Sequence, residues 1–168
     1  MVEFADSSQN GSFPRHELHS SGEISEQFKD QCDVLCDATE DWHSIDEAKA
    51  ILQDLSRARL AIGVLFKKDY ISIWWYSSWA GSEPPTELKA KDSRNAMYTL
   101  NQEDQWWDAG EYMRNGYYAY SATEKGRQHF LKNPAVRFYM QTEWHRRAYG
   151  RGQISEDLYN KIERRCQR

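Results

Sequence analysis

Residues 70–81, YISIWWYSSWAG, determine whether this chain contains a β-sheet. They place three tryptophans and two tyrosines in twelve positions, and aromatic and β-branched side chains favour strands. As a strand, ISIWWY (71–76) could pair with AIGVLF (61–66) in a hairpin closed by KKDY. A lone hairpin is only marginally stable, however, and no other segment offers a third strand.

The same stretch also has the pattern of a helix start. ISIWWY (71–76) aligns with ISEDLY (154–159) and, more loosely, with ISEQFK (24–29). In the first two copies an Ile precedes a Ser and a Tyr follows four residues after it, which is the spacing of a hydrophobic staple around a serine N-cap. We therefore expect a helix that begins at Ser72, with the strand as the alternative.

Caps and apolar periodicity predict further helices. The clearest one follows WHSIDEA, where Ser44 and Glu47 have the spacing of a capping box and an apolar pattern continues to Ile62. Further expected helix starts are Ser25, Ser121 with Glu124, Asn133 followed by Pro134, and Ser155. Helix ends are expected at Asn115-Gly116 and at Gly150 and Gly152.

These patterns predict an all-α fold, with a single compact domain of about six or seven short helices over residues 23–168. The alternative is an α+β fold with one β-hairpin near residues 61–76. A chain of 168 residues with 39% apolar side chains is long enough for one sizeable core. Residues 1–22 are rich in polar residues and have only isolated apolar positions, so they are expected to form a disordered N-terminal tail.

Charge is divided unevenly along the chain. Residues 1–124 carry 11 basic and 22 acidic side chains, whereas residues 125–168 carry 11 basic and 4 acidic ones. The basic C-terminal helical region 125–168 could bind a polyanion, fold back on the acidic body, or simply present solvated helix surfaces.

The sequence favours a cytoplasmic protein. It has no run of about 18 apolar residues, and its first twenty residues lack the basic and apolar regions of an export signal. Its three cysteines are an odd number, which does not make a disulfide framework. We therefore expect reduced thiols and no membrane association.

A metal site was considered at CDVLC (32–36), because Cys32, Cys36 and His43 could supply three ligands. Structural zinc sites usually have four ligands in two close pairs, and no second pair is present. Cys32 and Cys36 are better interpreted as half-buried core residues. No metal and no cofactor are therefore expected.

Signatures of catalysis are absent from the sequence. It contains no Gly-rich phosphate loop, no nucleophile elbow and no HExxH motif. Glu143 and His145 are close in sequence, but residues two apart on a helix point in different directions. The protein is thus expected not to be an enzyme, with an unrecognised active site as the third alternative for its function.

Two groups of residues are candidates for recognition. Exposed aromatic rings stack on bases, sugars or partner side chains, although here the aromatics are expected chiefly to fill the core. Arginines interleaved with aromatics are typical of single-strand nucleic-acid binding. The aromatic candidates are Trp74, Trp79 and Trp106, and the polyanion candidates are Arg137, Arg146, Arg147, Tyr149, Arg151, Arg164 and Arg165.

The C-terminal segment YGRGQISEDLYNKIERR (149–165) resembles the short C-terminal helical element called SHOCT. In that element a glycine, an isoleucine, a serine or threonine, an acidic pair and an aromatic precede a lysine-bearing helix. A glycine stop followed by any stapled serine cap has the same pattern. We therefore assign no family from it.

Together these features predict a non-catalytic intracellular helical interaction or regulatory module. It would have an aromatic-rich core and a basic C-terminal face, and it would bind a protein partner or self-associate. The alternative is a nucleic-acid-binding protein that uses its basic, aromatic-interleaved C-terminal helices.

Deletion of residues 1–22 should leave the thermal midpoint of unfolding nearly unchanged, because a polar tail contributes little to the core. Differential scanning calorimetry of the full and truncated chains measures the difference. A fall of more than about 5 °C would show that the tail packs on the folded body.

Overall fold

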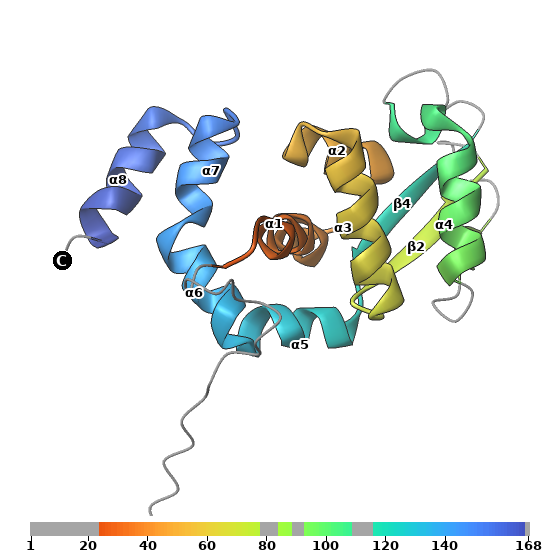
Figure 1. Cartoon of the computed structure of the whole chain (residues 1–168), viewed down its shortest axis with the longest axis horizontal. Helices are drawn as coiled ribbons and strands as arrows, with labels where there is room; N and C mark the ends of the chain where they lie inside the picture. Colours follow the sequence, from red (N-terminus) through yellow and green to blue (C-terminus); the bar gives the residue numbers. More distant parts are fainter. Residues whose placement is uncertain (1–23, 78–83, 89–92, 109–115, 167–168) are drawn as a thin grey trace, which may run out of the picture.

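The computed structural model describes residues 24–77, 84–88, 93–108 and 116–166, and shows an α+β fold (Figure 1). The predicted N-terminal tail, residues 1–22, lies outside the described residues. The helices are α1 (Glu26–Glu40), α2 (Ile45–Leu52), α3 (Leu55–Lys67), α4 (Ser93–Gln102), the 3₁₀ turn η2 (Asp104–Trp107), α5 (Glu124–Lys132), α6 (Pro134–Thr142), α7 (Trp144–Gly150) and α8 (Glu156–Cys166). The strands are β1 (His43–Ser44), β2 (Ile71–Tyr76), β3 (Thr86–Leu88) and β4 (Tyr117–Ala122).

The prediction of an all-α fold is wrong, because residues 71–76 form the inner strand β2 of a four-stranded antiparallel sheet. The strand order is β1-β4-β2-β3. Ser72 therefore does not cap a helix and instead lies opposite Ser121 of β4. The other three strands, β1, β3 and β4, come from segments that we did not predict as strands, and the pairing of β3 and β4 with β2 outweighs the local resemblance of ISIWWY to a helix start.

The α+β alternative placed a strand at 71–76 but gave it the wrong partner. Residues 61–66 belong to α3, where Ala61, Ile62, Leu65 and Phe66 form a buried face at helical spacing. β2 instead pairs with β3 and β4, of which β4 lies about 40 residues further along the chain.

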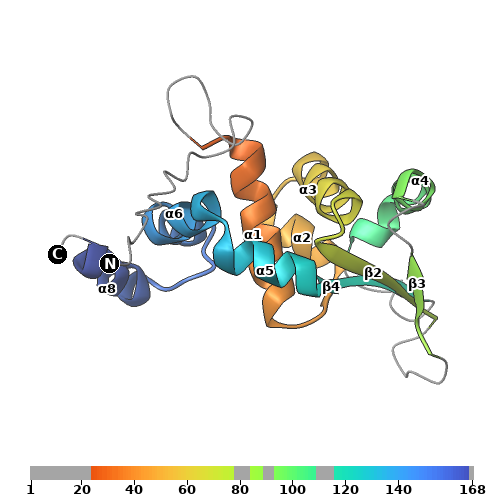
Figure 2. The ribbon, with the colours of Figure 1, turned by 90° about the horizontal axis from the view of Figure 1, so that it is seen from below.

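Alternation along the strands gives the sheet two faces. Ile71, Ile73 and Trp75 lie opposite Ala122, Tyr120 and Tyr118, so these side chains share one face. Ile71, Ile73 and Tyr120 are fully buried in the main core beneath α1, α2 and α3. Figure 2 shows this group of helices at one end of the sheet and α4 further along it.

Helix starts were predicted better than the fold class. Ser25 caps α1 by accepting a hydrogen bond from the Phe28 amide, and Asn133 caps α6 with Pro134 in the first turn, as expected. Ser44 does begin α2, but its hydroxyl makes no cap bond. Ser121 lies in β4, and Thr123 caps α5 instead.

The chain after α5 forms a helical arm on the other side of α1 from α3 (Figure 1). One continuous helix was expected from Pro134 towards Gly150, whereas α6 and α7 are separated at Glu143. A second small core joins the arm to α1, with Phe28 and Cys32 packed against Val136 and Tyr139. Helix α8 has no buried residue.

Replacement of Gly126 by alanine should destabilise the protein by at least about 3 kcal/mol, because the new Cβ would lie 1.9 Å from the Tyr70 carbonyl oxygen. Gly150→Ala is the matched control, since nothing lies within 4 Å of its Cβ position. Urea unfolding gives both values. Equal effects of the two substitutions would contradict the close approach of α5 to the start of β2.

Candidate functional site

Helix α2, a two-residue turn and helix α3 form a helix-turn-helix. Gln53 adopts the left-handed conformation (φ 56°, ψ 21°), and its amide donates to the Lys49 carbonyl at 2.7 Å. Asp54 then caps α3, since its carboxylate accepts a hydrogen bond from the Arg57 amide at 2.8 Å. We had interpreted these two helices as one. The acidic cap at Asp54 was the signal in the sequence that could have separated them.

Strands precede and follow this helix-turn-helix along the chain. β1 precedes α2, β2 follows α3, and β4 lies between β1 and β2 in the sheet. The chain between β2 and β4 adds β3 and α4.

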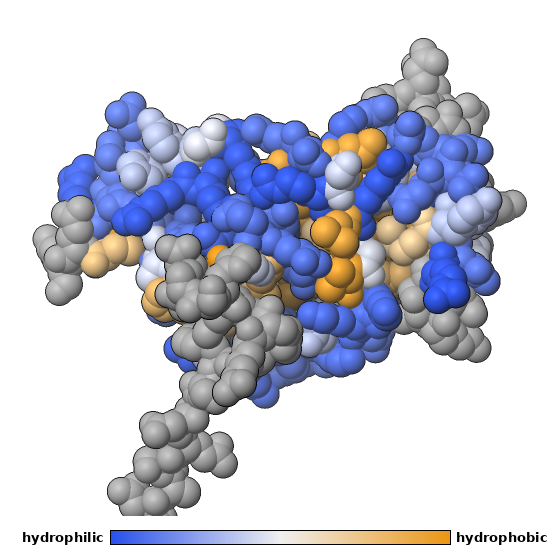
Figure 3. All heavy atoms as spheres, viewed as in Figure 1, coloured by the Kyte–Doolittle hydropathy of each residue, from blue (hydrophilic) through white to orange (hydrophobic). Residues whose placement is uncertain are grey.

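One side of α3 carries a stripe of small, apolar and basic side chains, which α4 covers in part at Gly63. Ser56, Leu60, Gly63 and Lys67 fall on one side of the helix by their spacing. Ser56, Leu60 and Lys67 are exposed, Leu60 by 52%. Figure 3 shows hydrophobic residues at the surface over α3, in the centre of this face.

The two arginines of α3 both make ion pairs within the protein. Arg57 donates to the Asp30 carboxylate through Nε at 2.8 Å and also through Nη2. Arg59 pairs with Asp104 and lies over the Trp107 ring, 5.7 Å from its centroid. The Arg57 side chain nevertheless keeps 40% of its surface exposed.

A buried carboxylate on α1 binds the C-terminal arm. Asp33, whose side chain is 3% exposed, accepts a hydrogen bond from the Tyr139 hydroxyl at 2.5 Å. Arg151 donates to it at 2.6 Å, and Arg147 lies within 3.4 Å. Burial, together with the Asp33 charge and hydrogen bond, raises the pKa of the Tyr139 hydroxyl.

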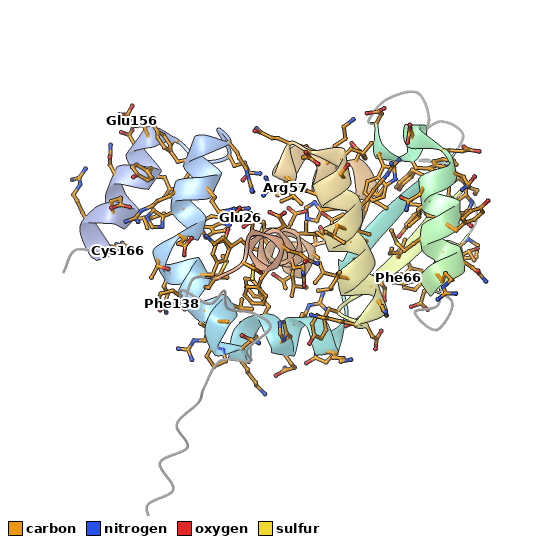
Figure 4. All side chains as sticks on the ribbon, in the orientation of Figure 1. Glu26, Arg57, Phe66, Phe138, Glu156 and Cys166 are labelled. Atoms are coloured by element: carbon orange, nitrogen blue, oxygen red, sulfur yellow. The ribbon has the colours of Figure 1, made fainter. Side chains whose placement is uncertain are left out.

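The same network continues along α1 towards α3. Arg147 also contacts Asp30 at 2.7 Å and Glu26, and Arg57 contacts both of these carboxylates. Figure 4 shows Glu26 of α1 and Arg57 of α3 on the neighbouring sides of their helices. Burial works against the charged form of Arg147, but Tyr139 and the contacting carboxylates outweigh it and raise the pKa of the guanidinium. Two arginines and two α1 carboxylates thus hold α1, α3 and α7 together.

A separate cluster joins α7 to α8. Glu163 accepts a hydrogen bond from Arg146 Nε at 2.8 Å, and the same oxygen lies 2.7 Å from Nε2 of the buried His145. Hydrogen bonds from Arg146 and His145 lower the pKa of Glu163 to about 2. Tyr149 stacks on Tyr159 of α8, with 4.5 Å between ring centroids.

The structure therefore divides the seven polyanion candidates into separate environments. Arg147 and Arg151 face the carboxylates of α1, and Arg146 faces Glu163. The exposed members are Arg137, Arg146, Tyr149, Arg164 and Arg165, of which Arg146 is paired with Glu163. The seven residues do not form one basic face.

The aromatic candidates are divided as well. Trp106 packs edge-on against Trp75 and Tyr118, with ring centroids 5.0 and 5.3 Å apart. Trp74 pairs with Glu87 and Ala119, so it lies on the opposite face of the sheet from Trp75. Trp79 lies outside the described residues.

Sequence reasoning also missed an aromatic group on the sheet face that carries Trp74. Tyr76 and Tyr117 stack with ring centroids 5.1 Å apart, and Trp42 packs on both. Trp42 keeps 41% of its surface exposed. Side chains alternate between the two faces of a strand, but this alternation predicts that Tyr76 and Tyr117 lie together only if β2 is known to pair with β4.

The cysteines considered for a metal site lie on α1 without converging on His43. Cys32 is buried in the small core of the arm. Burial, with the charges of Glu40, Asp33 and Asp37, raises the pKa of the Cys36 thiol to about 12. His43 instead contacts Asp37 and Glu47.

Comparison of this chain with protein-family models, with curated proteins and with solved structures gives no match. Among the described residues, none of the helices has both the length and the apolar character needed to cross a bilayer.

Arg147→Ala should destabilise the protein by about 3 kcal/mol, because it leaves Asp30 and Asp33 buried with fewer compensating charges. Arg137→Ala, on the exposed side of α6, should change the free energy of unfolding by less than about 0.5 kcal/mol. Chemical denaturation compares the two variants. If both cost the same, the network does not hold the arm on α1.

Proposed function

We propose that this protein is a non-catalytic regulatory module that binds duplex DNA through its helix-turn-helix. The observation that carries the proposal is the α2-turn-α3 unit followed by a strand pair. In helix-turn-helix proteins the second helix enters the major groove, and the residues of its first turns contact base edges. Here that helix is α3, which begins at Leu55.

The start of α3 offers suitable chemistry for such contacts. Ser56 is exposed and can donate to or accept from base edges. Leu60, one turn further, can contact a thymine methyl group. Lys67 extends the same stripe and can contact a phosphate.

The charge distribution supports the helix-turn-helix over the basic C-terminal region as the contact surface. Arg146, Arg147 and Arg151 are engaged with carboxylates, so contact with phosphates would have to break these ion pairs. Few free cations remain on α3. We therefore expect only about two or three phosphate contacts per chain, with modest affinity.

A second candidate function is protein binding on the same face. Leu60 is half exposed, Val64 is partly exposed, and Met97 of α4 packs beside Gly63. Apolar side chains of this kind suit a protein partner or a second copy of the chain. The overall acidic charge of the chain, −4 at pH 7, favours this candidate over DNA.

A fluorescently labelled duplex of random sequence tests the DNA proposal by anisotropy. At about 50 mM salt, binding in the range of about 1–10 µM is expected, with a log–log salt slope of about −2 to −3. Ser56→Glu should weaken this binding at least tenfold, because its carboxylate would face the phosphates. The fold should persist, since an acidic residue in the first turn of a helix is favourable.

Gln141→Glu, an exposed change of the same charge on α6, is the matched control and should alter binding less than twofold. Loss of binding in Arg137→Glu but not in Ser56→Glu would assign it to the C-terminal arm instead. If no duplex binds below about 100 µM at this salt, the DNA proposal fails. Sedimentation of the wild-type chain and of Leu60→Glu then tests self-association.

A further inference from the structure

Three metal-binding side chains from three different elements converge beside the helix-turn-helix. They are Asp37 near the end of α1, His43 of β1 and Glu47 in the first turns of α2. One ligand atom from each lies within 4.8 Å of the other two. We propose that these residues bind a divalent transition-metal ion, with zinc as the best fit.

His43 and Asp37 already have the separation that two zinc ligands need, whereas Glu47, which hydrogen-bonds to His43 directly, has to move back to admit the ion. His43 Nδ1 lies 3.4 Å from Asp37 Oδ2 and also contacts Glu47 Oε2. Ligands about 2.1 Å from a tetrahedral zinc ion lie about 3.4 Å from one another. The Glu47 side chain is 47% exposed, so it is free to adjust to the ion. Three protein ligands leave the fourth position for water or a ligand.

A second layer of contacts orients Asp37. The Tyr120 hydroxyl, which comes from β4 and is fully buried, donates to Asp37 Oδ2 at 2.9 Å. Outer hydrogen bonds of this kind fix ligating carboxylates and strengthen metal binding. Tyr120 also pairs with His43 across the β1–β4 ladder, so one strand positions two of the three ligands.

The electrostatics of the cluster favour a cation. Among the described residues, no lysine or arginine forms an ion pair with Asp37 or Glu47. Glu47 and Glu40 place further negative charge near Asp37. A divalent ion would relieve this repulsion between carboxylates.

An open cavity reaches one of the three ligands, Asp37. It has a volume of about 280 Å³ and lies between α1, α2, α7 and the loop before α8. Asp37 is part of its wall, together with Asp33, Glu40 and Ile51. An ion and its water ligands can approach Asp37 from this side.

Nitrogen and oxygen ligands, rather than sulfur, define the selectivity. Cys36 also lines the cavity, but its sulfur does not belong to the group of ligand atoms that converge at His43. One imidazole with two carboxylates suits zinc, whereas magnesium and calcium prefer oxygen alone. We expect zinc to bind more tightly than manganese, and manganese more tightly than magnesium. The site does not depend on the proposed DNA binding.

Isothermal titration of the metal-free chain with zinc chloride at pH 7.5 tests the proposal. A Cys166→Ser background removes the exposed thiol as a competing ligand. One site of micromolar or tighter affinity should appear, and zinc should raise the thermal midpoint. Both His43→Gln and Asp37→Asn should weaken binding at this site at least tenfold.

His129→Gln is the matched control, because His129 stacks on Tyr70, away from the cluster. It should bind zinc as the parent chain does. Circular dichroism of the two test variants without metal shows whether the fold is kept. Equal zinc affinity in the parent and in His43→Gln would assign binding elsewhere, for example to His16 and His19, and would overturn the proposal. The absence of any site tighter than about 100 µM would overturn it as well.

Discussion

The burial of one carboxylate, Asp33, determines how the helical arm after α5 is placed. A charged group that is 97% removed from solvent has to be compensated by hydrogen bonds and opposite charge. Arg147, Arg151 and Tyr139 provide that compensation, and all three belong to the arm that follows α5. The uneven charge along the chain is therefore compensated inside the protein, because basic side chains of the arm neutralise acidic side chains of α1.

Helix α1 joins the three parts of the molecule. Asp33 and Asp37 are one turn apart and both line the cavity beside α7. Asp33 faces the arm, while Asp37 contacts Tyr120 of the sheet and His43 just before the helix-turn-helix. An ion bound at Asp37 would thus link α1 directly to the start of α2. Helix α1 thus supports the ion-pair network, the proposed metal site and the proposed DNA-binding helix.

Local signals in the sequence predicted the starts of α1, α2, α6 and α8, because a cap such as Ser25 or Asn133 depends only on its neighbours. The fold class was missed because Ile71–Tyr76 becomes a strand through β4, whose partner residues are far away in sequence. The candidate site was missed for the same reason. Asp37, His43 and Glu47 share no motif, and only the turn after α1 and the β1–β4 ladder bring them together.

The pairing of β4 with both β1 and β2 also affects how the chain folds during synthesis. His43 of β1 pairs with Tyr120 of β4, and Ile71 of β2 pairs with Ala122 of β4. Neither β1 nor β2 can therefore pair with β4 until residues 117–122 have left the ribosome. Contacts of such long range slow folding and leave apolar strands uncovered in the meantime. The tryptophan-rich strand β2 is therefore the segment of the nascent chain that most needs protection from aggregation.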